Sequence, residues 1–340
     1  MIGKILYFHP ANDFTGSTKV LANLIEEKPD VTTYVVTDNK CLGALSFLPQ
    51  VKILPIWVCN VKYLGAVTWR LSWLFWSIIC LFRFNVYYVN TIIPFYPAFI
   101  GWLFGKQIVY HVHEKYIVYN HTIRIAEFVF NHIKSTRIYV SNYLKEQYPN
   151  NKGSISIVKY NKLPKSYLDS YKIVPLGNRS LKEILLIASL TKAKGIDMFV
   201  DIAKCMEDYN FTMILSTSKE VIDSYFVQEL PSNLSIYPAQ ADVRPYILKS
   251  DLLLNLSQPQ LCVETYGMTI LEAMAFQVPS IVPNIGGPLE LVEDGLNGYC
   301  VDTSNIDEVC DAIRNCLQPD NYKLLYMGTT VKLKQINEHE

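Results

Sequence analysis

The stretch Ser257–Gly298 reads SQPQLCVETYGMTILEAMAFQVPSIVPNIGGPLELVEDGLNG. An apolar helical run begins directly after Gly267. A glycine can adopt a positive φ and lets a ligand approach the backbone, and the first N–H groups of a helix have no partner inside the helix. Because such a helix start attracts phosphate groups, the stretch predicts an anion site at the backbone of Gly267, Met268 and Thr269.

Two acidic residues flank this predicted helix start. Glu272 lies about one turn into the helix, where a bound diphosphate would repel its carboxylate unless the side chain points past the phosphates towards hydroxyls such as a ribose diol. Glu264 precedes the helix and can face a different part of the ligand. The helix dipole alone also favours acidic residues near a helix start. Glu290, which follows Pro288 in a second helix start, is better explained in that structural way.

The order of these residues resembles a known motif. The motif is made of Glu264–Gly267, Glu272–Pro279, Gly286–Gly287 with Glu290, and Asp294–Gly298. This arrangement, over roughly forty residues, closely resembles the donor-binding motif of family 4 retaining glycosyltransferases, the glycosyl transferases group 1, which have the GT-B fold. The resemblance implies an α/β protein of GT-B type, with two Rossmann-like domains that face each other across a cleft.

Length and pattern indicate the same organisation. A chain of 340 residues exceeds what one core usually holds. Apolar strands alternate with helical segments, which predicts parallel sheets covered by helices on both sides. The polar, proline-bearing segment Lys162–Ser180 is the predicted linker. We therefore expect an acceptor-side domain over 1–165 and a nucleotide-sugar domain over 166–340, with a short charged tail after Asp320.

Composition excludes several classes of function. The 31 basic and 31 acidic residues balance, so there is no electrostatic footprint for nucleic acid. The eight cysteines form no Cys-x-x-Cys pair, which argues against a zinc site and favours reduced thiols in the cytoplasm. A Gly-x-Gly-x-x-Gly fingerprint is absent, which argues against a dehydrogenase. The chain contains no Asp-x-Asp pair that would suggest a metal site, and its first apolar run is too short for a signal peptide.

The resemblance assigns roles to further residues. It implies that Lys194 and the Gly267–Thr269 backbone take the donor diphosphate, that Glu272 takes the ribose hydroxyls, and that Glu264 lies over the donor sugar beside the reacting carbon. His113 matches the family position that contacts the donor sugar or the reaction centre. His111 is left out of the site, because a buried histidine with satisfied hydrogen bonds explains it equally well.

Two loops complete the predicted donor site. Gly16 belongs to a glycine loop that the family places near the donor phosphates or the acceptor, and Ser17 is predicted to cap a helix that begins at Thr18. The family has an arginine where this chain has Ser189. That arginine helps to neutralise the departing diphosphate. Its absence leaves open either a lower donor affinity or another compensating cation, for which Lys192 is the nearest candidate.

The most hydrophobic region runs from Tyr63 to Phe84. Its uninterrupted apolar part, Leu71–Phe82, is shorter than the roughly 20 residues that span a bilayer. We expect a buried helix here. The alternative is an interfacial helix whose Trp69, Trp73 and Trp76 dip into lipid headgroups near a lipid-linked acceptor.

Together these observations predict a retaining glycosyltransferase. It would move a sugar from a nucleotide-diphosphate donor to a hydroxyl of a glycan or lipid-linked acceptor, without metal or cofactor. The resemblance implies surface polysaccharide synthesis at the cytoplasmic side of the membrane. A nucleotide-sugar epimerase or hydrolase on the same architecture stays open because a fold does not fix a reaction, and so does a non-catalytic two-domain sugar-binding protein.

Overall fold

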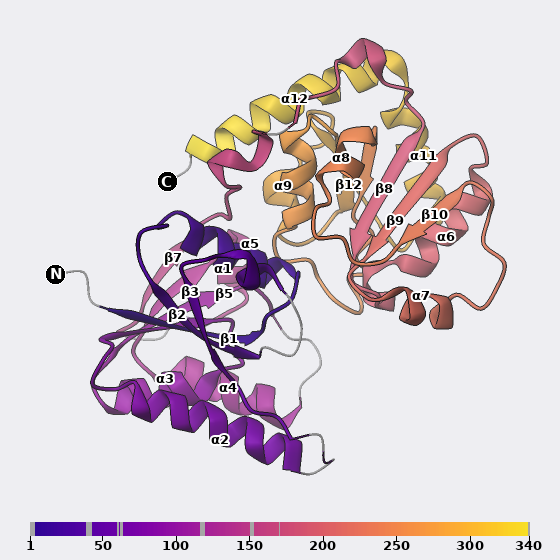
Figure 1. Ribbon diagram of the computed structural model, residues 1–340. Helices are drawn as coiled ribbons and strands as arrows, with labels where there is room; N and C mark the ends of the chain where they lie inside the picture. The colour runs from indigo at the N-terminus through magenta and orange to yellow at the C-terminus, as the bar shows by residue number, and fades with distance from the viewer. Residues whose placement is uncertain are drawn as a thin grey trace. The chain divides into compact units, whose positions relative to one another are not determined.

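A computed structural model of the chain describes residues 4–38, 43–59, 61, 64–115, 120–149, 153–169 and 171–338. The chain divides into two compact units, an N-terminal unit over residues 1–164 and a C-terminal unit over residues 165–340. Each unit is a parallel sheet covered by helices (Figure 1). The predicted α/β class is confirmed.

The N-terminal unit is built on a seven-stranded parallel sheet with the order β3-β2-β1-β4-β5-β6-β7. Its strands are β1 (Ile5–Ala11), β2 (Thr33–Asp38), β3 (Val51–Pro55), β4 (Val86–Asn90), β5 (Gln107–Val112), β6 (Thr136–Tyr139) and β7 (Ile155–Val158). Its helices are α1 (Gly16–Glu26), η1 (Ala44–Phe47), α2 (Leu64–Ile79), α3 (Phe95–Leu103), α4 (His121–His132) and α5 (Asn142–Glu146). In Figure 1, α2, α3 and α4 lie on one face of this sheet and α1 on the other.

The C-terminal unit has a six-stranded parallel sheet with the order β10-β9-β8-β11-β12-β13. Its strands are β8 (Glu183–Ala188), β9 (Asn210–Leu215), β10 (Leu234–Tyr237), β11 (Leu252–Leu254), β12 (Ser280–Pro283) and β13 (Gly298–Val301). Its helices are η2 (Lys165–Leu168), η3 (Leu176–Asn178), η4 (Lys192–Lys194), α6 (Ile196–Cys205), α7 (Lys219–Tyr225), α8 (Arg244–Lys249), α9 (Met268–Ala275), α10 (Pro288–Leu291), α11 (Ile306–Cys316) and α12 (Pro319–Glu338).

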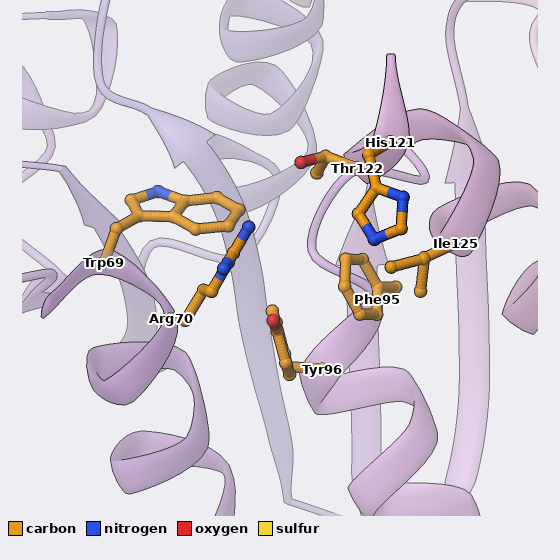
Figure 2. A pocket seen from close by; sticks show the side chains of 7 residues that line it. All are labelled: Trp69, Arg70, Phe95, Tyr96, His121, Thr122 and Ile125. Carbon is orange, nitrogen blue, oxygen red and sulfur yellow. The ribbon is translucent and has the colours of Figure 1, made fainter. Parts of the chain in front are cut away.

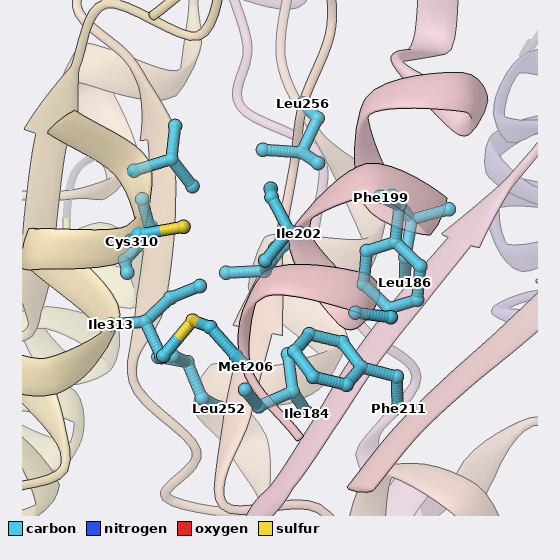
Figure 3. Packing of buried hydrophobic residues seen from close by; sticks show 14 of the residues in the cluster. Ile184, Leu186, Phe199, Ile202, Met206, Phe211, Leu252, Leu256, Cys310 and Ile313 are labelled. Carbon is cyan, nitrogen blue, oxygen red and sulfur yellow. The ribbon is translucent and has the colours of Figure 1, made fainter. Parts of the chain in front are cut away.

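Two helices and the sheet enclose the main core of the C-terminal unit. Phe199 and Ile202 of α6 pack with Phe211 of β9, and Cys310 and Ile313 of α11 close the other side (Figure 3). All five side chains are almost wholly excluded from solvent. Burial of large apolar side chains contributes on the order of 1.5–3 kcal/mol each. This core therefore holds the carboxyl ends of β8 and β11 in fixed positions.

The prediction that the hydrophobic region from Tyr63 to Phe84 forms a buried helix is wrong. The start of that region, Tyr63, lies outside the described residues, and α2 exposes its apolar stripe: Leu64, Val67, Leu71, Phe75 and Ile78 are each at least 41% exposed. The buried face is made instead by Ser72, Trp73 and Ser77. Among the described residues no helix has the length and apolarity to cross a membrane.

Two helix ends also differ from the sequence predictions. Helix α1 begins at Gly16 with Thr15 as its N-cap residue, so Ser17 lies inside the first turn and does not cap it. The segment after Asp320 is a 20-residue helix, α12, rather than a short charged tail. It packs against α9, and the side-chain amide of Gln277 donates to Thr330 at 2.6 Å. The polar surface of α12 hid its helical period, because only one narrow face is buried.

Candidate active site

Both sheets reverse their strand order beside their first strand. In the N-terminal unit β1 lies between β2 and β4, and in the C-terminal unit β8 lies between β9 and β11. Parallel α/β sheets bind ligands at the carboxyl ends of the strands at such a switch point. In the C-terminal unit the loops after β8 and β11 carry Lys194 and Glu264. In the N-terminal unit β4 ends at Asn90, and His113 directly follows β5.

Lys194 and Glu264 form an ion pair at the switch point of the C-terminal unit. The Lys194 ammonium lies 2.6 Å from Oε2 of Glu264 and 3.4 Å from the hydroxyl of Ser257. Burial alone would raise the pKa of Glu264, but Lys194 and further hydrogen bonds hold that pKa below its ordinary value. Burial would lower the pKa of Lys194, and Glu264 raises it instead. Two residues that are 70 positions apart thus share one charged site.

Glycines bring the loops of this pair together. Gly195 has φ +69°, and a Cβ there would lie 2.2 Å from the carbonyl oxygen of Leu256. The loop after β8 can therefore approach the loop after β11 only without a side chain. Gly287 donates its N–H to the carbonyl of Glu264 at 2.9 Å, and a Cβ at Gly287 would lie 1.9 Å from the carbonyl oxygen of Thr265. Both contacts fix the backbone segments that carry Lys194 and Glu264.

The predicted anion site lies at the start of α9. Gly267 is the N-cap residue with φ +102°, and no side-chain hydrogen bond caps this end. The half-buried Met268 and Thr269 follow in the first turn. Glu272 lies one turn further and is only 3% exposed. The pKa of Tyr167 is raised first by burial and then by the charge of Glu272.

Ser189, which stands where the family has an arginine, is half-buried, and Lys192 lies nearby on η4. The Lys192 side chain is exposed, and within the described part of the chain it has no ion pair or hydrogen bond. Ser189 directly follows β8. Lys192 is therefore a solvated cation in the loop that follows the central strand β8, and its assignment to the donor stays a prediction.

The N-terminal unit carries a group of buried polar side chains at its own switch point. His9 and Asn90 belong to the neighbouring strands β1 and β4, and the side-chain amide of Asn90 contacts Nδ1 of His9 at 2.9 Å and Nε2 of His113 at 2.8 Å. Burial lowers the pKa of His9 to about 4. The pKa of His113 is lowered mainly by burial and further by the two neighbouring histidines. Strand β5 ends at Val112, so His113 is the first residue of the loop rather than part of the strand.

Gly16, the remaining predicted residue, lies at the first position of α1 and is exposed. The loop before it is held by Asn12, whose side chain donates to Ser46 and accepts from the backbone of Leu45 in η1. Gly16 is thus part of a helix start rather than of a free glycine loop. Its role towards a donor stays a prediction.

A pocket in the N-terminal unit was not predicted from the sequence. Trp69 and Arg70 of α2, Phe95 and Tyr96 of α3, and His121 and Thr122 of α4 line it (Figure 2). The Arg70 guanidinium makes no ion pair with any residue that the structure describes. Aromatic walls and an available cation suit a sugar ring that carries an anionic group. The sequence signal for this pocket is the Trp69–Arg70 pair, in which an aromatic ring and a cation occupy adjacent positions.

Comparison with known proteins supports the resemblance. Residues 182–319 match the family model described as glycosyl transferases group 1. An uncharacterized glycosyltransferase of Methanocaldococcus jannaschii is 27% identical over 179 residues, which cover 52% of this chain and 48% of that protein. The matched region thus spans about half the length of this curated relative.

Solved structures resemble the whole chain. HepE of Anabaena in complex with UDP and glucose has a TM-score of 0.73 at 18% identity and covers 99% of this chain and 98% of its own. A glycosyltransferase from Rickettsia africae has a TM-score of 0.72 at 16% identity, with 99% of each chain covered. At these identities the likeness shows the fold, and that fold is the GT-B architecture expected from the motif.

Proposed function

We propose that this chain, which resembles the glycosyl transferases group 1 through residues 182–319, transfers a sugar from a nucleotide diphosphate to a hydroxyl of a glycan or lipid-linked acceptor. The observation that carries the proposal is the Lys194–Glu264 pair, placed where the strand order of the C-terminal sheet reverses. The proposal includes retention at the anomeric carbon, independence of metal and cofactor, and a place in surface polysaccharide synthesis at the cytoplasmic face of the membrane.

The C-terminal unit has the groups that a nucleotide diphosphate needs. Lys194 and the N–H groups of Gly267, Met268 and Thr269 are assigned to the diphosphate, and Glu272 to the ribose hydroxyls. A helix start offers partial positive charge to the phosphates. Lys192 is the proposed substitute for the cation that Ser189 does not provide.

Donor binding would change the Lys194–Glu264 ion pair and thereby the charges that the site presents. An arriving diphosphate competes with Glu264 for Lys194, because a phosphate oxygen is an equally good acceptor for the ammonium. The Glu264 carboxylate is then released to face the donor sugar beside the reacting carbon. Negative charge that develops on the leaving phosphate is stabilised by donors already held in place, and such preorganised stabilisation usually lowers the barrier more than any other single effect.

The N-terminal unit is assigned to the acceptor. The pocket between α2, α3 and α4 offers aromatic walls and Arg70, which has no ion pair with any described residue, and a sugar phosphate would use both. His113 is assigned to the reacting sugar, and Gly16 to the donor phosphates, on the family resemblance.

A nucleotide-sugar panel tests the donor half of the proposal. UDP-glucose is the first probe because HepE, a structural neighbour, was solved with it. A ligand at 100 times its Kd stabilises the folded state by about 2.7 kcal/mol, so a bound donor raises the melting temperature measurably. Lys194→Ala should lose most of this shift, while Lys204→Ala, an exposed lysine outside the site, should keep it. If no nucleotide sugar in the panel shifts the melting temperature, the proposed donor site is wrong.

Acceptor dependence separates transfer from the alternative reactions. A transferase releases free nucleoside diphosphate only when an acceptor hydroxyl is present, whereas a hydrolase releases it in buffer and an epimerase never does. A bound donor without any of these products would support the non-catalytic sugar-binding alternative. Release that is equally fast with and without acceptor would reject transfer.

We also infer that the exposed stripe of α2 contacts a membrane surface. The stripe defined above faces solvent, together with Phe99 and Trp102 of α3, and no acidic residue occurs between Asp38 and Glu114 while six Lys and Arg do. An apolar face in a segment that carries basic but no acidic residues suits an anionic bilayer surface. Of the three tryptophans expected as anchors, Trp73 was wrong, because its side chain is 0% exposed. Trp69 and Trp76 are half-buried, and the indole of Trp76 donates to the carbonyl of Pro55.

Vesicle flotation tests the membrane contact. Leu71→Glu with Phe75→Glu should abolish co-flotation with phosphatidylglycerol vesicles, because both side chains are exposed and the variant keeps the core. The matched control is Leu324→Glu with Met327→Glu, two exposed apolar residues of α12 in the C-terminal unit. If wild type does not float, or if both double variants float like wild type, the α2 stripe is not a membrane contact.

A further inference from the structure

Asn255 lies at the switch point of the C-terminal sheet, directly after β11. Its backbone N–H donates to the carbonyl of Ile281 on β12 at 2.9 Å, which holds the end of β11 against the neighbouring strand. The backbone N–H of Ser257 donates to Oδ1 of the Asn255 side chain at 3.2 Å. The side chain of Asn255 is therefore anchored at the start of the loop that carries Glu264.

The contact with Ser257 determines which end of the Asn255 amide is which. A backbone N–H can only donate, so the amide atom that meets Ser257 is the oxygen, and the NH₂ group is left for another partner. The same side chain forms a hydrogen bond with the Glu264 carboxylate. An ionised carboxylate can only accept, so the NH₂ group of Asn255 is the donor in this second contact.

The Glu264 carboxylate thus has donors of three kinds. The ammonium of Lys194 lies 2.6 Å from its Oε2, and the side chain of Asn255 and the backbone N–H of Tyr266 supply further hydrogen bonds. Burial raises the pKa of Glu264, and the donors together bring that pKa below its ordinary value. Of these donors only Lys194 carries a charge.

We propose that Asn255 is a positioning residue that keeps the Glu264 carboxylate in place when an arriving diphosphate draws Lys194 away. The proposal rests on the proposed function, in which the diphosphate competes with Glu264 for this lysine. An anion attracts the Lys194 ammonium, whereas the amide of Asn255 is neutral and is anchored through its oxygen by Ser257. The carboxylate therefore keeps a fixed donor and continues to face the donor sugar.

A purely structural role of Asn255 would make a different residue acceptable. Asparagine and aspartate side chains both accept a hydrogen bond from the backbone two residues further on, and both form this turn. If the turn to Ser257 were the whole role, aspartate would serve equally well. Only the asparagine amide also donates to a neighbouring carboxylate. Asn255→Asp therefore keeps the turn, removes the donor and adds a second negative charge beside Glu264.

The titration of Glu264 tests the proposal without donor or acceptor. In the intact protein labelled with [5-¹³C]glutamate, the carboxyl signal that is missing from Glu264→Gln belongs to Glu264. We expect Glu264 of the wild type to have a pKa below the ordinary value of a glutamate. Asn255→Leu and Asn255→Asp should each raise this pKa. A wild-type pKa at or above the ordinary value, or a pKa that both variants leave unchanged, overturns the proposal.

Lys194→Ala imitates the loss of the lysine to the diphosphate. In that background Asn255→Leu should raise the pKa of Glu264 further, because the carboxylate then keeps only the backbone donor of Tyr266. The titratable groups that act on the pair among the described residues are Lys194 itself and, through Lys194, Cys262. Cys262→Ser should leave the difference between wild type and Asn255→Leu in place. A Glu264 pKa that is equal in Lys194→Ala with and without Asn255→Leu would reject the role of Asn255.

The two Asn255 variants cover each other in folding. Asn255→Leu removes both contacts of the side chain and can destabilise the loop. Asn255→Asp keeps the hydrogen bond from Ser257 and nearly the same volume. If Asn255→Leu does not fold, the titration of Asn255→Asp decides alone, and a Glu264 pKa equal to that of the wild type overturns the proposal.

Turnover separates positioning from donor binding. Asn255→Leu should lower kcat on the order of ten-fold or more and leave the Kd of the nucleoside diphosphate unchanged, because Lys194 and the start of α9 are retained. Asn255→Asp should be impaired at pH 8 and recover as the pH falls, since the introduced carboxyl donates to Glu264 once it is protonated.

The control for turnover is Asn178→Asp, at an exposed asparagine of the C-terminal unit whose side chain has no hydrogen bond with any described residue. It should keep the wild-type pH profile. An altered Glu264 titration with wild-type kcat in Asn255→Leu would reject the role towards the sugar. If the wild type binds no nucleotide sugar, the proposed function fails, whereas the titration still decides whether Asn255 holds Glu264.

Discussion

Replacement of Lys194 by alanine removes the cation that the C-terminal unit places against Glu264. At 2.6 Å and an effective dielectric constant of about 20, the two charges attract each other by about 6 kcal/mol before the cost of their partial burial is subtracted. The side chains are 26% and 18% exposed, so solvent screens the pair only in part. Without Lys194, burial should raise the pKa of Glu264, and a diphosphate would meet one cation fewer.

The loss should appear mainly in turnover, because the leaving phosphate gains negative charge as the glycosidic bond breaks. We expect Lys194→Ala to lower kcat about 100-fold, which corresponds to about 2.7 kcal/mol, the scale for losing one preorganised donor. Lys192→Ala should cost less than about three-fold, since its side chain is exposed and solvated. Release of nucleoside diphosphate at saturating donor is the assay, with Lys204→Ala as the control.

The double variant decides whether the two lysines share a role. Independent roles give costs that multiply, whereas a shared role gives strong non-additivity. Near-wild-type kcat in Lys194→Ala would remove this loop from the mechanism. The start of α9 would then be the remaining phosphate anchor of the C-terminal unit.

Three further perturbations test the site and the fold. Glu272→Gln should weaken donor binding about ten-fold, because a neutral amide binds a ribose diol less well than a carboxylate does; unchanged affinity in calorimetry would refute the ribose assignment. Gly195→Ala should lower the free energy of unfolding by about 2 kcal/mol or more, since its Cβ would meet the carbonyl of Leu256 at 2.2 Å and φ is positive. Urea unfolding measures this loss. Gly105→Ala, also at positive φ but with open space around it, separates the cost of the backbone conformation from the cost of the steric clash. The folded pKa of His9 lies below its unfolded value of about 6.5, so its contribution is complete above pH 6.5 and is lost as the pH falls towards 4. The free energy of unfolding should drop by about 3 kcal/mol over that window through His9; a flat profile in urea titrations would contradict the buried neutral state.

Local patterns in the sequence were enough to predict the sheets and the start of α9. Gly267 ends one extended segment and an apolar helical period follows it, so glycine and periodicity agree on one boundary. These features depend on neighbours along the chain, which a sequence shows directly.

Features that depend on the third dimension could not be predicted. Hydrophobicity identified α2 but not the face that it buries, because that face combines Trp73 with the small polar Ser72 and Ser77. The Ser72 hydroxyl is paired with the backbone of Trp57 and that of Ser77 with the helix's own backbone, and a hydrophobicity pattern does not show such pairs. The contact of Lys194 with Glu264 depends on a loop approach that Gly195 permits. The contacts of Asn90 with His9 and His113 depend on the register of three strands, and no spacing along the sequence encodes that register.

Helix α12 is the last element to be synthesised during translation, and this order affects how the C-terminal unit folds. α12 follows every other element of the C-terminal unit, yet it packs against α9 and adds Tyr322 and Leu325 to the main core. Domains generally fold as units and in the order in which the ribosome makes them. The N-terminal unit can therefore fold while the rest is still being translated. A nascent chain that has reached Cys316 still lacks the cover of α9, so the helix that carries Glu272 stays open to chaperones until the 20 residues of α12 have been made.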